Sequence, residues 1–169
     1  LVEIGEDSII VARTETGDIR AMHNICRHRG ARVCEELSGN RKTYVCPYHG
    51  WVYHVDGSLK AARETHVMPD FDAAAHGLKP VKCVTYMGLV FINCSPDAGD
   101  LVASLENIRE PLGAYDLEHA KVAHRKTYRV EANWKLAIEN YLECYHCATS
   151  HRAYAKMHTL KDLEEKSAP

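Results

Sequence analysis

The sequence predicts an α+β protein, with a small all-β domain of antiparallel strands in residues 1–97 and a helix-containing second part in residues 98–169. Short β-rich runs separated by Gly and Asp turns fill the first half. A Ser/Pro/Gly/Asp cluster at residues 94–100 then indicates a linker. Helical spacing of apolar residues follows it. The change in pattern at the linker sets the predicted domain boundary.

Three hairpins are predicted in the first part. Their strands span residues 8–13 with 19–25, 51–55 with 58–62, and 81–87 with 88–94. The first turn is expected at Thr16-Gly17-Asp18 and the last at Gly88. Asp56-Gly57 is the strongest turn signal, because Asp and Gly tolerate the positive φ of a tight primed turn.

The second part is predicted to hold two helices and one strand. A helical pattern runs through residues 101–115 until Pro111 and Gly113 break it. The polar segment 121–131 is a candidate strand. Asn133 is placed to cap a helix that continues through residues 134–150. An apolar stripe on that helix is expected from Trp134, Ile138, Tyr141 and Tyr145.

Composition excludes several classes of protein. The net charge of −2 gives no basic field for nucleic acid. The longest apolar run, residues 88–94, is too short to cross a bilayer. Seven cysteines, an odd number, favour metal ligation and buried thiols in a reducing cytoplasm over a disulfide framework. The chain lacks an initiator Met and ends in a polar run, so we expect a fragment of a longer polypeptide.

One Cys/His constellation lies in the predicted β domain. A C-x-H pair and a C-x-x-H pair provide two thiolates and two imidazoles. The four residues are Cys26, His28, Cys46 and His49. Such a set suits either one Zn²⁺ or an iron–sulfur cluster with mixed ligation. Gly30 and Gly50 follow the pairs and let the backbone approach cluster sulfurs.

The segments "CRHRG" and "CPYHGW" resemble the Rieske iron–sulfur motif, in which two His replace two Cys on one iron. The resemblance implies a Rieske [2Fe-2S] domain with an antiparallel β-sandwich over residues 1–97. High-potential members carry one more Cys in each loop, joined as a disulfide. Tyr48 stands at the second of these positions, so Cys34 is interpreted as an ordinary buried thiol. Trp51 replaces a cluster-bonding hydroxyl, which predicts a low-potential cluster.

A second constellation lies in residues 133–151, "NWKLAIENYLECYHCATSH". On a helix Glu139, Glu143 and His146 share one face. His151 then falls on the opposite side. Both His could reach one metal only if the helix ends or distorts near residues 149–150. Spacing alone makes this a weak metal site.

This segment is similar to the catalytic-domain motif of Rieske non-haem iron oxygenase α-subunits, the ring-hydroxylating oxygenase family. The resemblance implies an α+β helix-grip domain, here truncated. It also implies a mononuclear Fe(II) bound by His146 and His151 and by a carboxylate far downstream. Glu143 takes the position of a bridging, catalytic Asp that links the iron site to a Rieske histidine of the neighbouring subunit. The acidic residues of 162–165 are therefore interpreted as solvated surface.

The function implied by the resemblance is that of a terminal oxygenase component. A flavin/iron–sulfur reductase supplies NAD(P)H electrons through the cluster to Fe(II), which activates O₂ to hydroxylate a C–H bond. Glu143, at a position where the family usually has an aspartate, associates the chain with betaine- and carnitine-type oxygenases, and hence with N-demethylation of a quaternary ammonium compound. A homotrimer is expected. An aromatic-ring-hydroxylating dioxygenase, a Rieske ferredoxin-type electron carrier and a structural zinc protein remain alternatives.

Overall fold

The computed structural model describes residues 1–157. The chain divides into two compact units, Leu1–Lys121 and a second unit that begins at Val122. The predicted boundary after residue 97 lies inside the first unit and stays a prediction.

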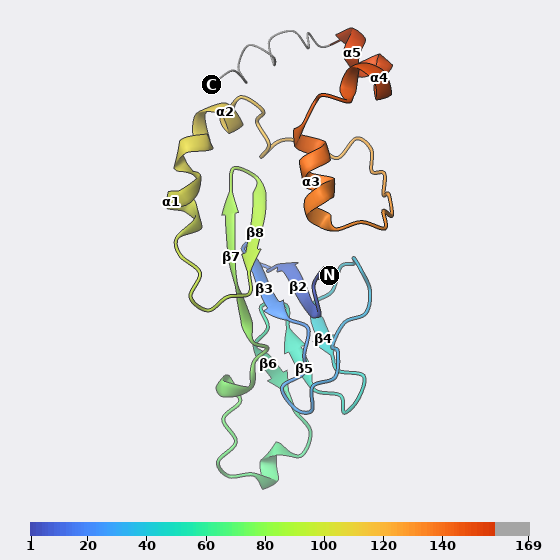
Figure 1. Cartoon of the computed structure of the whole chain (residues 1–169). Helices are drawn as coiled ribbons and strands as arrows, with labels where there is room; N and C mark the ends of the chain where they lie inside the picture. Colours follow the sequence, from blue (N-terminus) through green and yellow to red (C-terminus); the bar gives the residue numbers. More distant parts are fainter. Residues whose placement is uncertain (158–169) are drawn as a thin grey trace. The chain divides into compact units, whose positions relative to one another are not determined.

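Two antiparallel sheets form the first unit (Figure 1). The larger sheet has the order β1-β2-β3-β7-β8, with β1 at Val2–Ile4, β2 at Asp7–Arg13, β3 at Ile19–His23, β7 at Pro80–Tyr86 and β8 at Leu89–Asn93. The smaller sheet consists of β4 (Thr43–Val45), β5 (Val52–His54) and β6 (Leu59–Ala61). Short 3₁₀ turns, η1 (Thr65–Val67) and η2 (Ala74–His76), precede β7. The predicted antiparallel β domain is confirmed.

The hairpin turns differ in type. Met87 and Gly88 both have positive φ, 49° and 80°, and join the paired residues Tyr86 and Leu89. This is the two-residue primed turn that suits strand twist. At Asp56-Gly57 the predicted primed turn is wrong, because only Gly57 has a positive φ, 89°. The loop is one residue longer, and the Ser58 backbone N–H donates to the Asp56 carboxylate at 2.9 Å.

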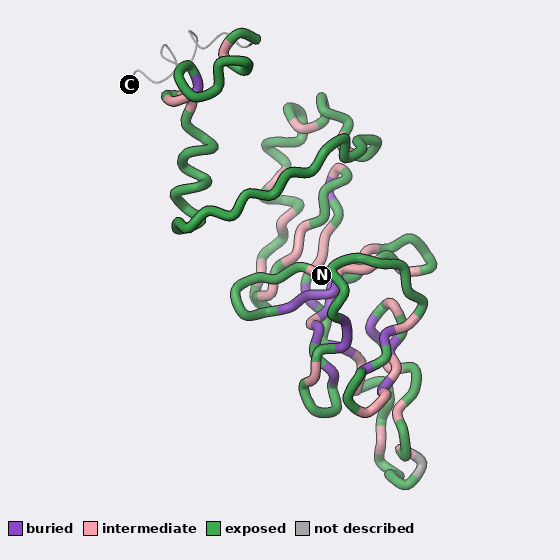
Figure 2. Tube along the Cα trace, turned by 90° about the vertical axis from the view of Figure 1, so that its right-hand side faces the viewer, coloured by how far each residue is buried: buried purple, intermediate pink, exposed green. Residues whose placement is uncertain are grey.

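The core lies in the first unit. Figure 2 shows the buried residues gathered in its strands and adjoining loops, whereas the second unit is mostly exposed. Tyr53 from β5 is fully buried and Met22 from β3 is 2% exposed, and both belong to one cluster with Trp51 and Leu78. That cluster also contains Cys26 and Cys46. Two of the predicted metal ligands are therefore part of the core.

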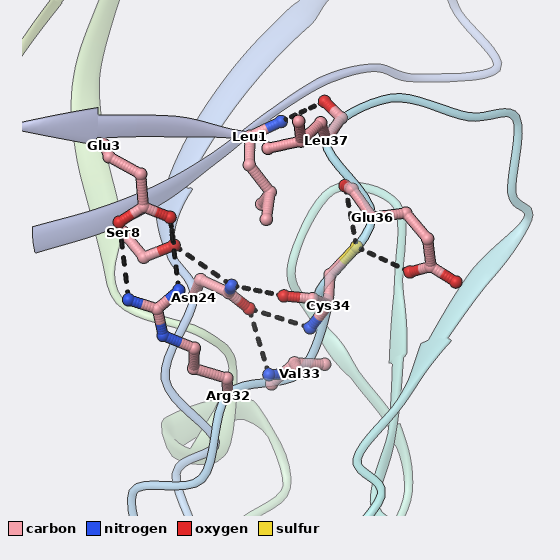
Figure 3. Close-up of polar contacts among 9 residues, drawn as sticks. All are labelled: Leu1, Glu3, Ser8, Asn24, Arg32, Val33, Cys34, Glu36 and Leu37. Carbon is pink, nitrogen blue, oxygen red and sulfur yellow. Dashed lines mark hydrogen bonds and ion pairs between the residues drawn. The ribbon is translucent and has the colours of Figure 1, made fainter.

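Asn24 is a fully buried polar residue that connects β2, β3 and the segment after Cys26. Its amide donates to the Ser8 hydroxyl at 3.2 Å and to the Cys34 carbonyl at 2.6 Å. Its carbonyl oxygen accepts from the backbone N–H groups of Val33 and Cys34 at 3.0 and 2.9 Å. Figure 3 shows this arrangement. Since every polar atom of Asn24 is satisfied, the side chain fixes the far end of the first ligand loop.

The segment after β8 is helical but interrupted. It comprises α1 (Leu101–Leu105), a 3₁₀ turn η3 (Glu106–Ile108) and α2 (Arg109–Gly113). Asp100 caps α1 by accepting from the Val102 N–H at 2.9 Å. The prediction that Pro111 breaks the helix is wrong, since Pro111 lies in the first turn of α2, where no intrahelical N–H bond is lost. The break occurs earlier, at η3.

The second unit contains α3 (Trp134–Leu142), α4 (Cys147–Ser150) and α5 (Arg152–Met157). The predicted cap is confirmed, because the Asn133 side chain accepts from the Lys135 N–H at 2.9 Å. The predicted strand at 121–131 is wrong, since no strand within residues 1–157 pairs with it. The unbroken helix over 134–150 is also wrong, because Glu143 takes an extended conformation. No helix of the described residues is long and apolar enough to span a membrane.

Replacement of Asn24 by Ala tests the role of this side chain. The change leaves two buried N–H groups and one buried carbonyl without partners, which destabilises the chain by about 3 kcal/mol. Urea unfolding followed by circular dichroism measures the loss. Asn40→Ala, at an exposed position, is the matched control and changes the free energy of unfolding little. Equal stability of the two variants would contradict the assignment.

Candidate metal centres

The two ligand loops of the first unit have the same main-chain hydrogen bonds. In one, the Cys26 N–H donates to the Ala31 carbonyl at 2.8 Å and the Gly30 N–H donates to the Cys26 carbonyl at 3.0 Å. In the other, the Cys46 N–H donates to the Trp51 carbonyl at 2.8 Å and the Gly50 N–H donates to the Cys46 carbonyl at 3.0 Å. Both glycines have positive φ, 74° and 71°. The conformation requires φ > 0 there, which favours glycine.

These loops bring the four predicted ligands together with the thiols inside and the imidazoles outside. Cys26 and Cys46 are each 2% exposed and belong to the same buried core cluster. The rings of His28 and His49 are 4.4 Å apart between centroids, at 73°. His28 is exposed and His49 is half-buried. The geometry therefore separates a buried sulfur pair from an accessible nitrogen pair.

This donor set fits a two-iron cluster. Each iron of such a cluster takes only two protein ligands, and mixed Cys₂/His₂ ligation places the two types on different irons. Within residues 1–157, no group of three or more His, Cys, Asp or Glu side chains is arranged to hold one metal ion. A single-ion Cys₂His₂ zinc site would need all four to converge. The separation of a buried sulfur pair from an outer imidazole pair matches the division of ligands expected for the cluster.

Burial is the largest cause of the pKa shifts at Cys46 and His49. Burial raises the pKa of the Cys46 thiol, so binding of a thiophilic metal here must displace a proton. Burial, and then the positive charges of His28 and Arg29, lowers the pKa of His49. A lower pKa favours the neutral imidazole, which is the form that binds metal.

Tyr53 is a functional residue that sequence reasoning missed. Its hydroxyl oxygen accepts from the Arg27 N–H at 3.0 Å and lies 3.2 Å from Cys26 Sγ. Because the oxygen already accepts from Arg27, its own O–H is available to donate to the sulfur. Burial, and then this contact, raises the pKa of Tyr53. The sequence signal was a Tyr alternating with Trp51 on the strand after the second loop.

Aromatic rings surround the imidazole side of the site. Trp51 stacks on His28 with centroids 5.0 Å apart and an interplanar angle of 8°. Phe71 and His76 stack on each other at 4.5 Å, and both meet the indole edge-on. A cavity of about 610 Å³ opens here, lined also by Arg27 and Arg63. The exposed side of the loops is thus a hollow with aromatic walls and a basic rim.

The second predicted site is built on a turn rather than on one helix. The helix α3 ends at Leu142, and Glu143 follows with φ −96° and ψ 135°. The expected shared face of Glu139, Glu143 and His146 is therefore wrong. His146 precedes α4, and His151 ends it with φ −122° and ψ 61°. The required break near residues 149–150 is confirmed, and the two imidazole centroids lie 5.1 Å apart.

Glu143 holds His146 directly. One carboxylate oxygen of Glu143 lies 2.5 Å from His146 Nδ1. A proton on Nδ1 satisfies this contact and leaves the Nε2 lone pair free to bind a metal, the arrangement found for metal-ligating histidines with carboxylate partners. Asn140 lies farther from the same nitrogen, at 3.5 Å. The Glu143 side chain stays 47% exposed, so its carboxylate can accept a further hydrogen bond.

The site of the second unit brings together the two imidazoles predicted as metal ligands. A cavity of about 1150 Å³ is lined by both histidines, Glu143 and Asn140, with Tyr141 at its wall. No third ligand joins them among the described residues. The acidic residues Asp162, Glu164 and Glu165, expected to be solvated surface, lie outside the described residues. Two imidazoles correspond to the two histidines of a two-His, one-carboxylate facial triad, and the described residues of this site do not include its carboxylate.

Two cysteines flank His146 in this turn. Cys147 is 7% exposed and Cys144 is half-buried. A hydrogen bond from Cys144, and then burial, raises the pKa of the Cys147 thiol to about 11. The charge of a Cys144 thiolate raises the pKa of the Tyr154 phenol, which comes from α5. Both thiols and the Tyr154 phenol line the same cavity as the two imidazoles.

Two family models match the chain. The Rieske [2Fe-2S] domain matches residues 1–72. The ring hydroxylating alpha subunit catalytic domain matches residues 117–169. The first match contains the four ligands of the β loops, and the second contains Glu143, His146 and His151.

Comparison with individual proteins agrees with the family models. The chain is 43% identical over 171 residues to the glycine betaine monooxygenase oxygenase subunit of Pseudomonas aeruginosa, a match that covers 99% of this chain and 38% of that protein. The structure of the quaternary ammonium Rieske monooxygenase CntA with its substrate L-carnitine superposes with a TM-score of 0.81 at 31% identity, over 94% of this chain and 46% of that one. Naphthalene 1,2-dioxygenase from Rhodococcus sp. with bound indole superposes with a TM-score of 0.78 at 32% sequence identity, over 89% of this chain and 36% of that one. The chain thus spans about two fifths of the length of the curated relatives it matches.

Replacement of Tyr53 by Phe tests its bond to Cys26. A hydrogen bond to a ligand sulfur stabilises the more negative, reduced cluster. Its loss lowers the reduction potential by about 40 mV, because one such bond is worth about 1 kcal/mol and about 59 mV is a tenfold change for one electron. A redox titration followed by electron paramagnetic resonance measures the shift.

Tyr48→Phe is the matched control, since the Tyr48 ring is 61% exposed beside His49. It should leave the potential near that of the unchanged protein. The same titration tests the low-potential prediction drawn from Trp51, which a strongly positive midpoint would refute.

Proposed function

The chain belongs to the Rieske non-haem iron oxygenase α-subunits, and we propose that it is the electron-accepting and oxygen-activating component of a monooxygenase for quaternary ammonium compounds. Its Rieske domain implies a [2Fe-2S] cluster, and its catalytic-domain segment implies a mononuclear iron. The observation that carries the proposal is the presence of both ligand sets in one chain.

In this proposal Cys26 and Cys46 bind the buried iron of the cluster, and His28 and His49 bind the outer iron. Burial of the thiols and exposure of the imidazoles support the assignment. The outer histidines stand next to the hollow with the basic rim, where an acidic donor surface would find complementary charge. The core around Tyr53 keeps water from the sulfur side.

His146 and His151 are proposed as the ligands of the mononuclear iron. When bound, that iron supplies the oxygen-activating chemistry and leaves positions open for O₂. Glu143 keeps the proton of His146 on Nδ1 and so orients Nε2 toward the metal. The exposed remainder of its carboxylate is proposed to accept a hydrogen bond from a Rieske histidine of a neighbouring subunit. Glu143 then connects the two metal sites of adjacent chains.

The proposed substrate class follows from the relatives. Identity is 43% to the glycine betaine monooxygenase oxygenase subunit, 33–38% to carnitine monooxygenase oxygenase subunits and 35% to the large subunit of anthranilate 1,2-dioxygenase, so the glycine betaine enzymes support the assignment most strongly. Oxidation of an N-methyl group gives an N-hydroxymethyl product that releases formaldehyde. An aromatic-ring dioxygenase is the second candidate, favoured by the likeness to naphthalene dioxygenase. The match over residues 117–169 argues against a Rieske carrier that only moves electrons.

The proposed partners are a flavin/iron–sulfur reductase and two further copies of the chain, which would form a trimer. A bridge from Glu143 to the next subunit requires such an assembly. We place the protein in the reducing cytoplasm, a proposal supported by the absence of disulfides among the described cysteines.

The substrate assignment is tested by incubating the protein with NADH, a reductase of this family and either glycine betaine or L-carnitine. Formaldehyde formed in proportion to NADH consumed is expected. Naphthalene serves as the comparison substrate. Formation of a cis-dihydrodiol from naphthalene, without formaldehyde from either amine, would favour the aromatic dioxygenase instead.

His146→Ala tests the second metal site. One iron per chain is lost, while the two irons and two acid-labile sulfides of the cluster remain. Formaldehyde release falls below detection. His124→Ala, an exposed histidine of the same unit, is the matched control and retains all iron. Metal and sulfide analysis decides, and retention of the third iron in His146→Ala would exclude that residue as a ligand.

A further inference from the structure

The two cysteines beside the second metal site are close enough to be joined. Cys144 and Cys147 occupy the ends of a four-residue turn that the Cys147 N–H closes onto the Cys144 carbonyl at 3.0 Å. The ends of such a turn have Cα atoms less than about 7 Å apart, and a disulfide needs about 4.4–6.8 Å. Both residues line one cavity.

The two thiols differ in solvent exposure. Cys144 is half-buried and faces the cavity of about 1150 Å³, so it can meet a small oxidant. Cys147 also lines that cavity but is only 7% exposed, so it is the less accessible of the two and takes the part of the resolving thiol. Among the seven free cysteines, this is the one pair that shares a turn within the described residues. The C-x-x-C spacing is typical of reversible dithiol chemistry.

We infer that Cys144 and Cys147 form a peroxide-sensitive dithiol that closes to a disulfide and thereby switches the adjoining metal site. The Cys144 thiolate attacks one oxygen of a hydroperoxide, the O–O bond breaks, and a sulfenic acid and water result. The Cys147 sulfur then attacks the Cys144 sulfur and expels the hydroxyl oxygen as a second water. Two thiols and one hydrogen peroxide thus give one disulfide and two waters. A dithiol reductant reverses the change by exchange.

The switch acts through the turn that the disulfide would close. That turn contains His146 at its third position and follows Glu143 directly. Closure constrains the backbone on both sides of the imidazole and so disturbs the 2.5 Å contact between Glu143 and His146 Nδ1. Loss of a carboxylate partner typically weakens metal affinity at least about tenfold.

The effect on catalysis depends on the proposed function, whereas disulfide formation does not. The test treats the cluster-loaded protein with one equivalent of hydrogen peroxide, alkylates the free thiols and maps them by mass spectrometry. The expected product is a Cys144–Cys147 peptide lighter by two hydrogens, restored by a dithiol. Cys83 and Cys94, also half-buried, are the internal controls and stay alkylatable. Equal oxidation of these controls, or sulfinic acid on Cys144 without a disulfide, would overturn the inference.

Variants separate the two steps. Cys147→Ser cannot close the disulfide, so dimedone should trap a sulfenic acid on Cys144, and Cys144→Ser should give neither product. Fe(II) binding to the oxidised protein should weaken about tenfold and recover with the dithiol. Unchanged Fe(II) affinity would refute the switch. Disulfide formation together with failure to demethylate betaines would contradict the proposed function and leave the dithiol inference standing.

Discussion

The structure of the first unit depends on one constraint: two loops must place four side chains of two kinds against a common centre. Equivalent hydrogen bonds in the two loops satisfy this constraint. The N–H of each Cys closes its loop, and a glycine with positive φ reverses the chain direction in each. The thiols then point into the core and the imidazoles away from it. The sheets on either side serve this end, because β3 leads into the first loop and the β4–β5 hairpin contains the second.

Around that centre, core residues also determine the hydrogen bonding and packing next to the cysteine sulfurs. Trp51 directly precedes β5 and Tyr53 lies within it; the Tyr53 hydroxyl is hydrogen-bonded to Cys26 Sγ, and the indole of Trp51 stacks on His28. Asn24 performs the corresponding task on the first loop by satisfying the backbone groups of residues 33–34. All three residues are buried, and the polar atoms of Asn24 and Tyr53 are hydrogen-bonded, so these side chains stabilise the loops from within the core.

Features that depend on neighbouring residues could be predicted from the sequence, whereas contacts between residues far apart in the chain could not. Ligand identities, hairpin positions and the Asn133 cap depend on residues adjacent in sequence, and the matching strands and cap are present. The Tyr53 hydroxyl was missed because its partner lies 27 positions away, across two strands. The helix over 134–150 was overestimated because periodicity records apolar spacing and not the point at which Glu143 turns extended.

That turn explains why two imidazoles separated by five positions can share a metal. A continuous helix would direct them to different sides, whereas the extended residue 143 and the short α4 bring the rings within 5.1 Å. The same bend lets the longer side chain of Glu143 curl back to Nδ1, so the extra methylene relative to Asp is accommodated locally. It also brings Cys144 and Cys147 to the ends of one turn. The two imidazoles and the two thiols therefore depend on the same few backbone torsions.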